Sequence, residues 1–452
     1  MLLWELIETR YSEPMLKQAQ PVTLWRASAI MLFGALVVNG GNYLFALITA
    51  RFLGPSAYGT FAAILSIVVI SGIFGSAGNI LAMRSVAQFA PDGWASAWHT
   101  RQAFFAVMRW IFLGTAVVVL AISPFLIHKL SLSPVHIVFI IILTLLAIAL
   151  SIERGFIQGM QQYSRVTINM ASEVVLKLGG VLLLALLLHT SGFIGSNKVE
   201  AILIFFGLGM SMAWFYVWKP AWKKTQAATE VVATPSYSYI WNTVVSLAAL
   251  AVLMNGDVIT AKASLSAEAT GHMAALAKMA QVIFFSTSPI VGAVFPLISN
   301  NFDRGSKHVH LLVKALVLSI TISVGILGVF VLFPNTVVKV LFGSSYIGAS
   351  PLLAKMGIAM VVFTIGNLYV NYFLCLKERW YSLMLIGIAV VHIVLLKQFN
   401  SDLAHIVTVD LFSFSLLSAS GVLWYIVTKR RQITQLLRFE EGMWRLLLRG
   451  AE

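Results

Sequence analysis

Charge and cysteine are both scarce in this chain. Only 11% of its 452 residues are charged, against about 25% in a typical soluble domain. Cys375 is the one cysteine, which excludes a disulfide framework and a thiol-based metal site. The chain also lacks a G-x-x-x-x-G-K-[ST] phosphate loop, and no polar connection is long enough to hold a nucleotide-binding domain. An ATP-driven pump is therefore excluded.

Apolar residues are abundant instead, at 59% of the chain, and the mean hydropathy is +0.89. A run of about 20 apolar residues crosses a bilayer as a helix, and only helices and closed barrels satisfy their backbone there. The runs here are continuous, whereas barrel strands alternate over about ten residues. They predict an all-α polytopic membrane protein of about 12 transmembrane helices. The predicted spans are 28–50, 60–82, 103–123, 135–153, 166–188, 201–218, 238–260, 272–298, 311–333, 352–375, 381–399 and 404–428.

A short sequence motif recurs in the two halves of the chain. Ile48-Thr49-Ala50-Arg51 ends the first apolar run and Ile259-Thr260-Ala261-Lys262 ends the seventh, and a Ser-Ala pair and a Gly follow each. The recurrence predicts two six-helix bundles related by an internal repeat, an architecture common among transporters. The predicted segments are a cytoplasmic N-terminal segment (1–26), the first bundle (27–218), a cytoplasmic linker (219–237), the second bundle (238–428) and a basic cytoplasmic tail (429–452).

Lysine and arginine are distributed unevenly between alternate connections. Most of the 31 fall on the side predicted to hold both termini, and positive residues favour the cytoplasmic side. Both termini are therefore expected to be cytoplasmic, in a plasma or inner membrane. Residues 1–26 lack an apolar core with a small-residue cleavage site, so no cleaved signal peptide is predicted. The basic tail is expected to lie on anionic lipid and not to bind nucleic acid.

Two separated motifs resemble one family. Ala50 to Gly59 reads A-R-x-L-G-P-x-x-Y-G before a glycine-rich second span, and Leu341 to Tyr346 reads L-F-G-x-x-Y before the tenth. Together they resemble bacterial polysaccharide-biosynthesis flippases of the Wzx-like type, in the multidrug/oligosaccharidyl-lipid/polysaccharide exporter superfamily. The resemblance implies two six-helix bundles around a central cavity with alternating access. It also implies a cargo of polyprenyl-pyrophosphate-linked glycan, which is turned from the cytoplasmic to the outer leaflet.

Charged residues inside the predicted spans are mostly positive. A charge at mid-span costs about 2.5–3.5 kcal/mol on insertion scales and usually faces a bundle interior or a water-filled cavity. Arg84, Lys177 and Lys278, with Gln281 on the face of Lys278, are candidates to bind an anion such as pyrophosphate or an acidic sugar. Glu173 precedes Lys177 by four residues, which also fits a structural ion pair within one helix. Arg84 also fits an ordinary topology charge at the inner face.

Two carboxylates, Asp257 and Asp410, also fall inside predicted spans. Each either pairs with a nearby Lys or titrates as a proton or sodium site, so H⁺ and Na⁺ are the candidate coupling ions. The histidines are scattered without metal-ligand spacing, and no Ser/His/Asp or paired-carboxylate arrangement indicates catalysis. We therefore expect no cofactor, no metal and no enzymatic activity.

Asparagine side chains and the repeated Ile-Thr-Ala-Arg/Lys motif complete the candidate site. Asn39 and Asn42 share one helical face, as do Asn367 and Asn371, and such amides bind sugars or join helices. Arg51 and Lys262 fall at equivalent ends of the first and seventh spans, where they either snorkel to headgroups or brace an outer gate. The residues of this predicted outer gate are Arg51, Gly54, Tyr58, Gly59 and Lys262.

These patterns predict a flippase for a lipid-linked oligosaccharide of O-antigen, capsule or exopolysaccharide synthesis. Its expected partners are that glycan lipid, the bilayer and other polysaccharide-assembly membrane proteins. A multidrug exporter of the same superfamily would extrude cations and need carboxylates in the first-half cavity, and the first two spans have none. A peptidoglycan-precursor flippase would have two more helices. A membrane glycosyltransferase or polymerase would need a large outer loop with acidic or His residues.

Overall fold

The structure is a computed structural model that describes residues 24–89, 94–191, 197–218, 237–303 and 308–449. Among these residues every regular element is a helix. The predicted N-terminal segment up to residue 23 and the predicted linker up to residue 236 lie outside the described residues. The first half of the chain forms α2 (Leu24–Ser71), α3 (Ile73–Phe89), α4 (Trp94–Leu130), α5 (Pro134–Gly159), α6 (Tyr163–Ser191) and α7 (Lys198–Trp218). The second half forms α8 (Tyr237–Ser264), α9 (Ala267–Asp303), α10 (Val309–Leu332), α11 (Pro334–Leu341), the 3₁₀ helix η3 (Ser344–Ala349), α12 (Ser350–Cys375), α13 (Arg379–Gln398) and α14 (Leu403–Arg449).

Helix α2 contains two membrane crossings joined by a turn at Gly54. The backbone there has φ 72° and ψ 171°, a conformation that glycine adopts readily, and Pro55 begins the next helical stretch. The rings of Phe45 and Phe61, on either side of the turn, have centroids 6.2 Å apart, so α2 folds back on itself. Eleven helical segments of the described residues are long and apolar enough to span a membrane. Because the first of them holds both arms of α2, the described residues contain twelve segments able to cross a membrane, which confirms the predicted all-α polytopic fold.

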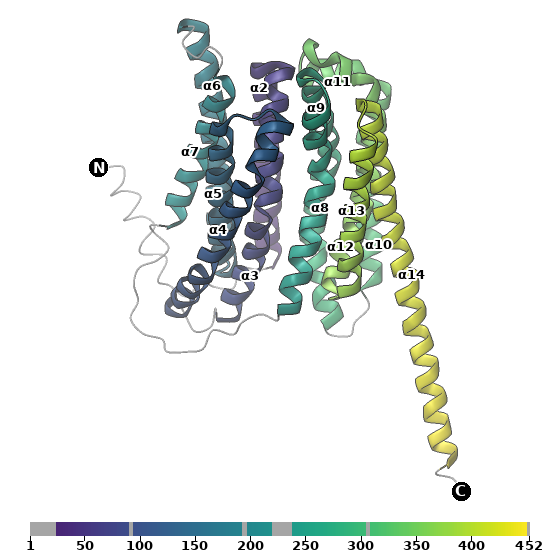
Figure 1. The fold of residues 1–452 in the computed structure, drawn as a ribbon. Coiled ribbons are helices and arrows are strands. Elements are labelled where there is room, and N and C mark those ends of the chain that lie inside the picture. Colours follow the sequence, from purple (N-terminus) through teal and green to yellow (C-terminus); the bar gives the residue numbers. More distant parts are fainter. Residues whose placement is uncertain (1–23, 90–93, 192–196, 219–236, 304–307, 450–452) are drawn as a thin grey trace.

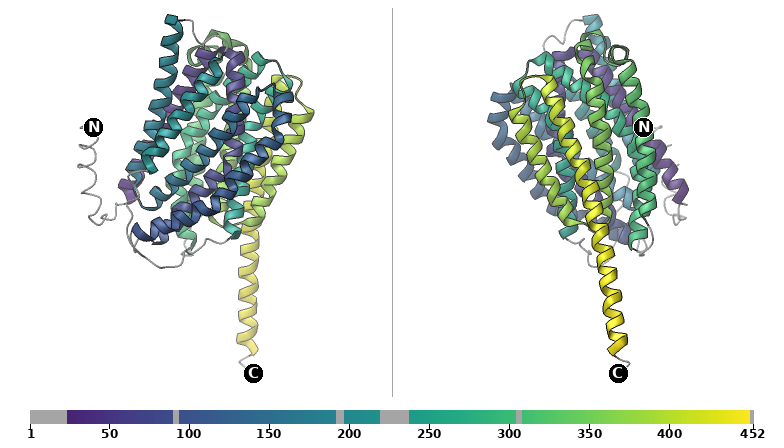
Figure 2. Two further views of the ribbon diagram at one scale, coloured as in Figure 1. Left: turned by 60° about the vertical axis from the view of Figure 1, so that its left-hand side comes forward. Right: turned by 90° about the vertical axis from the view of Figure 1, so that its right-hand side faces the viewer.

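The helices form two lobes that lie side by side (Figure 1). In the first lobe, α2 to α7, α3 packs on α5 and α2 packs on α6; in the second, α8 to α14, α12 packs on α14 and α8 packs on α13. The broadest contact between the lobes joins α2 to α9. Helix α11 and η3 lie at one end of the bundle, which we call the α11 end. At the opposite end α14 continues as one helix well beyond the bundle (Figure 2).

Glycines set the distance between α3 and α5 in the first lobe. A Cβ atom on Gly155 would lie 2.3 Å from the carbonyl oxygen of Asn79, and one on Gly159 would lie 2.5 Å from that of Met83. Both are far inside van der Waals contact, so only glycine permits this approach. The close packing fixes the position of α5, which carries the charged pair Glu153 and Arg154 of the first lobe.

Candidate functional site

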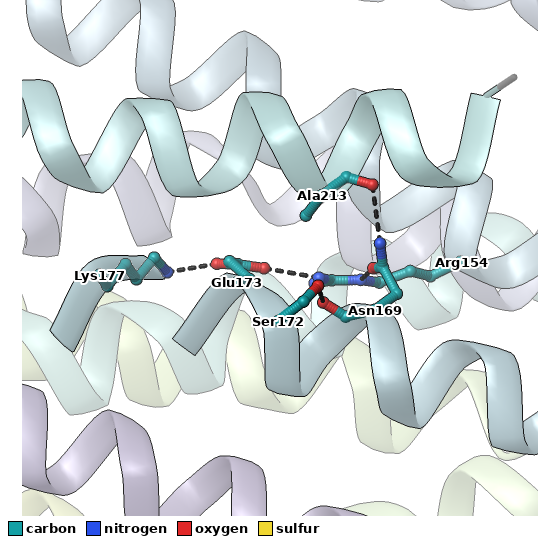
Figure 3. A network of polar contacts seen from close by, with 6 residues as sticks. All are labelled: Arg154, Asn169, Ser172, Glu173, Lys177 and Ala213. Atoms are coloured by element: carbon teal, nitrogen blue, oxygen red, sulfur yellow. Dashed lines mark hydrogen bonds and ion pairs between the residues drawn. The ribbon is translucent and has the colours of Figure 1, made fainter. Parts of the chain in front are cut away.

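A buried ionic network joins three helices of the first lobe (Figure 3). Nη2 of Arg154, on α5, lies 2.5 Å from Oε2 of Glu173, on α6, and the other oxygen of Glu173 accepts a hydrogen bond from Lys177. The Lys177 ammonium also lies 3.8 Å from the ring centroid of Phe206, on α7, a cation–π contact. The predicted pair within α6 is therefore present, with Arg154 as a second cation on the same carboxylate.

Asn169 completes this network. Its side-chain oxygen accepts a hydrogen bond of 2.8 Å from Nε of Arg154, and its amide nitrogen donates one of 2.7 Å to the carbonyl of Ala213 on α7 (Figure 3). The side chain thereby links α5, α6 and α7. Two cations share one carboxylate, so the network carries one positive charge in excess.

The other carboxylates described in the first lobe are paired as well. Glu153, which is fully buried, binds Arg101 of α4, and that guanidinium lies 4.9 Å from the ring centroid of Phe105. Glu200 lies 3.0 Å from Nε2 of His136. Every carboxylate in the described part of the first lobe therefore has a basic partner, and none is left to bind an organic cation.

Three predicted residues of the second lobe lie on α8 and α9, toward the α11 end. Nζ of Lys278 donates a hydrogen bond of 2.9 Å to Oε1 of Gln281, both on α9. Asp257, on α8, is buried, accepts a 2.7 Å hydrogen bond from the backbone N–H of Val258, and interacts electrostatically with Lys278. The structure thus places Asp257 of α8 near Lys278 and Gln281 of the next helix, α9.

Asp410, on α14, has a neighbour that the sequence did not reveal. Nε2 of His392, on α13, lies 4.0 Å from Oδ1 of Asp410, and both side chains are fully buried. Neither the two ring nitrogens nor the two carboxylate oxygens have a hydrogen-bond partner among the described residues. His392 gave no signal in the sequence because its neighbour comes from another helix.

The two family-like motifs meet at the α11 end, where they join the lobes. The guanidinium of Arg51 donates to the backbone carbonyls of Val340 and Leu341 at the end of α11. The hydroxyl of Tyr346 donates to the carbonyl of Ala50 over 2.8 Å. Tyr58 of the first motif lies 6.1 Å from Phe342 and 6.2 Å from Tyr346 of the second, between ring centroids. Motifs about 290 residues apart therefore form one aromatic and polar contact.

Lys262 makes the reciprocal contact from the second lobe. Its Nζ donates a 2.8 Å hydrogen bond to the hydroxyl of Thr60 in the first lobe. Close by, a Cβ atom on Gly271 would lie 1.9 Å from the carbonyl oxygen of Pro55, and one on Gly59 would lie 2.7 Å from the backbone nitrogen of Gly271. The residues of the predicted gate thus all lie at or beside this contact, which is closed; that they open and close it stays a prediction.

The predicted amide pairs differ in their contacts. Asn371 donates to both the backbone carbonyl and the side-chain oxygen of Asn367, at 2.8 and 3.2 Å, so these two amides bind each other. Asn42 is exposed and Asn39 half-buried on α2. The backbone of Arg84 belongs to α3, and its side chain lies outside the described residues. The amides and Arg84 remain candidates for cargo contact.

Comparison with known proteins gives one family and one fold. The family described as polysaccharide biosynthesis protein matches residues 24–302, more than half of the chain. An inward-facing multidrug resistance MATE family transporter of the MOP superfamily has a TM-score of 0.65 at 13% identity, over 91% of this chain and 99% of the other. An outward-facing multidrug resistance MATE family transporter has a TM-score of 0.62 at 15% identity, over 91% of this chain and 96% of the other. A MOP superfamily transporter from Pyrococcus furiosus Vc1 (DSM3638) has a TM-score of 0.59 at 15% identity, over 91% of this chain and 96% of the other. Its binding pocket is described as of reverse polarity. No curated protein matches the chain significantly.

Proposed function

This chain belongs to the polysaccharide biosynthesis protein family, and from that membership we propose that it is a flippase for a polyprenyl-pyrophosphate-linked oligosaccharide. The cargo would move from the cytoplasmic to the outer leaflet for the synthesis of a surface polysaccharide. The observation that carries the proposal comes from the first lobe. Each described carboxylate there has a basic partner, and the Arg154, Lys177 and Glu173 network holds one more cation than carboxylate. An anionic head group suits such a site, because a cation held in a poorly solvated interior attracts it strongly.

The orientation in the membrane follows from the same charges. We propose that the α11 end faces outward and that both termini are cytoplasmic. The connections at the opposite end are rich in Lys and Arg, among them Lys377 and Arg379 between α12 and α13, and positive residues collect on the cytoplasmic side. An even number of crossings brings both ends of the chain to the same side, in agreement with this orientation.

Transport would proceed by alternating access between the two lobes. The glycan head group would enter between them from the cytoplasmic side while the contact at the α11 end is closed, and the polyprenyl tail would remain in lipid. Lys177 and Lys278, one from each lobe, and Arg84 would neutralise the pyrophosphate or acidic sugars. Separation of Arg51 from α11 and of Lys262 from Thr60 would then release the head group outward.

An ion-coupled multidrug exporter is the second candidate, and the solved structures of the same fold favour it. Such an exporter for organic cations would present a free carboxylate to its cargo. In the described part of the first lobe each carboxylate is already held by an Arg, Lys or His. This pairing supports an anionic cargo over a cationic one.

The direct test is mass spectrometry of lipid-linked glycans from cells with and without the gene. We expect a polyprenyl-pyrophosphate oligosaccharide to accumulate in the null strain, protected from a glycosidase added outside. An unchanged pool of glycan lipids would reject the flippase. Drug sensitivity of the same null strain would then test the exporter.

A single substitution tests the role of the buried cation. Lys177→Met keeps an unbranched side chain that is only one atom shorter and leaves Arg154 and Glu173 as a neutral pair, so we expect the fold to be retained while the excess charge is lost. Loss of one charged contact to the cargo is worth about 1.5–3 kcal/mol, so transport should fall by about tenfold or more. Lys314→Met, at an exposed position on α10, is the matched control. Equal transport by the two variants would remove Lys177 from the cargo site.

A further inference from the structure

Four ionisable side chains of the second lobe lie at one depth of the bundle, on four different helices. Asp257 is on α8, Lys278 on α9, His392 on α13 and Asp410 on α14. Each lies within about three turns of the helix end that reaches the α11 end. An ionisable residue at this depth of a membrane protein is rare and usually functional.

His392 and Asp410 are the members of this group that the protein leaves unsatisfied. Their side chains have no exposed surface, and the 4.0 Å between Nε2 and Oδ1 is longer than a hydrogen bond. A buried polar group without a partner costs about 1–3 kcal/mol, and an ionised one costs more. One proton placed between the two groups would remove the charge of the carboxylate and allow a hydrogen bond after a small movement.

The surroundings of the pair are otherwise apolar or already engaged. The ring of His392 stacks on Phe414, with centroids 6.2 Å apart, and its Nε2 faces the backbone of α8 at Gly256. Asp257 follows Gly256 directly and interacts electrostatically with both Asp410 and Lys278. Two other titratable groups on α12 and α14 are engaged elsewhere: Lys355 donates a hydrogen bond to Thr408, and His405 binds exposed Asp402. The titratable groups that face the pair are therefore Asp257 and, beyond it, Lys278.

A proton suits this group better than a metal ion. Among the described residues no three His, Cys, Asp or Glu side chains are placed to hold a metal. The ammonium of Lys278 beside Asp257 would repel a sodium ion, which also needs several oxygen ligands. A proton needs only one oxygen and one acceptor, and His392 with Asp410 supplies both.

We propose that Asp410, His392 and Asp257 form a proton-exchange site in the second lobe, which is protonated when the α11 end is closed. Lys278 lies seven residues, about two turns, from Gly271 and therefore on the face of α9 that touches Pro55 of the first lobe. Opening the α11 end would bring water to Lys278 and Asp257 and then to the pair behind them. Water stabilises the ionised carboxylates, so the open α11 end favours the deprotonated site, and uptake of a proton from outside closes this end.

The direction of this linkage fits export. A proton bound from outside would return the carrier to the state that loads cargo from the cytoplasm. Its release to the cytoplasm, before the loaded carrier opens outward, would move one proton inward for each cargo exported. H⁺ is thus the proposed coupling ion. That coupling role rests on the proposed transport function, whereas the binding of the proton and its effect on closure do not.

The test measures opening of the α11 end against pH in the purified full-length protein, without any glycan lipid. In a Cys375→Ala background, Ala50→Cys places a thiol at a fully buried position beneath Tyr346, and Ser56→Cys places one at an exposed position of the same helix. The ratio of their reaction rates with a membrane-impermeant maleimide cancels the pH dependence of the thiol itself. One linked proton should raise the ratio with pH, by at most about tenfold per pH unit.

Variants identify the site. Asp410→Asn cannot ionise and should give a low ratio that no longer depends on pH. Asp402→Asn removes a carboxylate that is exposed at the start of α14 and should keep the wild-type slope. His392→Phe, which can stack on Phe414, should lose the slope too, and serves if the Asp410 variant does not fold. A wild-type ratio that is independent of pH, or a slope retained in the Asp410 or His392 variant, would overturn the proposal and leave the flippase assignment untouched.

Discussion

Gly271→Ala should force the two lobes apart at the α11 end. Gly271 lies in the second turn of α9, and its Cα lies against the carbonyl of Pro55 in the other lobe. A Cβ atom at this position would lie 1.9 Å from that oxygen, and also 2.7 Å from Cα of Pro55. These are backbone atoms next to the turn at Gly54, so no side chain can rotate away. The distance must widen to 3.0 Å or more, which requires the lobes to separate.

The size of the effect on closure comes from the cost of overpacking. Overpacking by one methyl group in a well-packed contact costs about 1–3 kcal/mol, and here the cost falls only on the closed state of the α11 end. Alanine also stabilises a helix by about 1 kcal/mol relative to glycine, but this gain is the same in both states. The closed state should therefore lose roughly fivefold to a hundredfold in population relative to the open state.

The reaction of Ala50→Cys with an impermeant maleimide measures this shift. Gly292→Ala is the matched control, because it adds the same methyl group to the same helix with no heavy atom within 4 Å. We expect faster labelling in the Gly271 variant and unchanged labelling in the Gly292 variant. If both react at the wild-type rate, the lobes do not close through Gly271 and Pro55, and the gate assignment fails.

Three further predictions use the same contacts. Glu173→Gln leaves the cations of Arg154 and Lys177 buried without a carboxylate, which should cost about 3–5 kcal/mol. Its melting temperature should fall well below that of the exposed-site control Glu268→Gln, and equal values would contradict the network. Tyr346→Phe removes the hydrogen bond to Ala50, worth about 1 kcal/mol, so labelling of Ala50→Cys should rise about fivefold; no change would exclude this bond as a latch. Lys278→Glu should abolish glycan-lipid transport at unchanged protein level, and wild-type transport would exclude Lys278 from the anion site.

The sequence was sufficient to predict elements that depend on local order. Continuous apolar runs predict the helices, because backbone satisfaction in lipid leaves few alternatives. The spacing of Glu173 and Lys177 predicts their pair, because residues four apart lie on one helical face. Helix α11 was not predicted, because an eight-residue helix is too short to give a membrane-span signal.

Contacts between helices account for the parts of the site that were missed. Arg154 reads in sequence as one of several positive residues near a helix end, and only the packing of α5 on α6 brings it to Glu173. His392 and Asp410 lie 18 residues apart on separate helices, and no periodicity relates them. The two motifs show the same limit: each is visible in the sequence, but their contact between Tyr58 and Tyr346 is a property of the folded lobes.

The two lobes differ in whether their charge can change. In the first lobe Glu153 and Glu173 are held by Arg101, Arg154 and Lys177, and each such pair would lose several kcal/mol if one partner were neutralised. Its positive charge is therefore fixed, which suits recognition of an anion in every cycle. In the second lobe Asp410 has no such partner, so a proton can enter or leave at lower cost. The proposed proton site then lies in the second lobe alone, whereas the proposed anion contacts come from both lobes, through Lys177 and Lys278. A variant at Asp410 should therefore alter the pH dependence of opening while the Lys177 network remains.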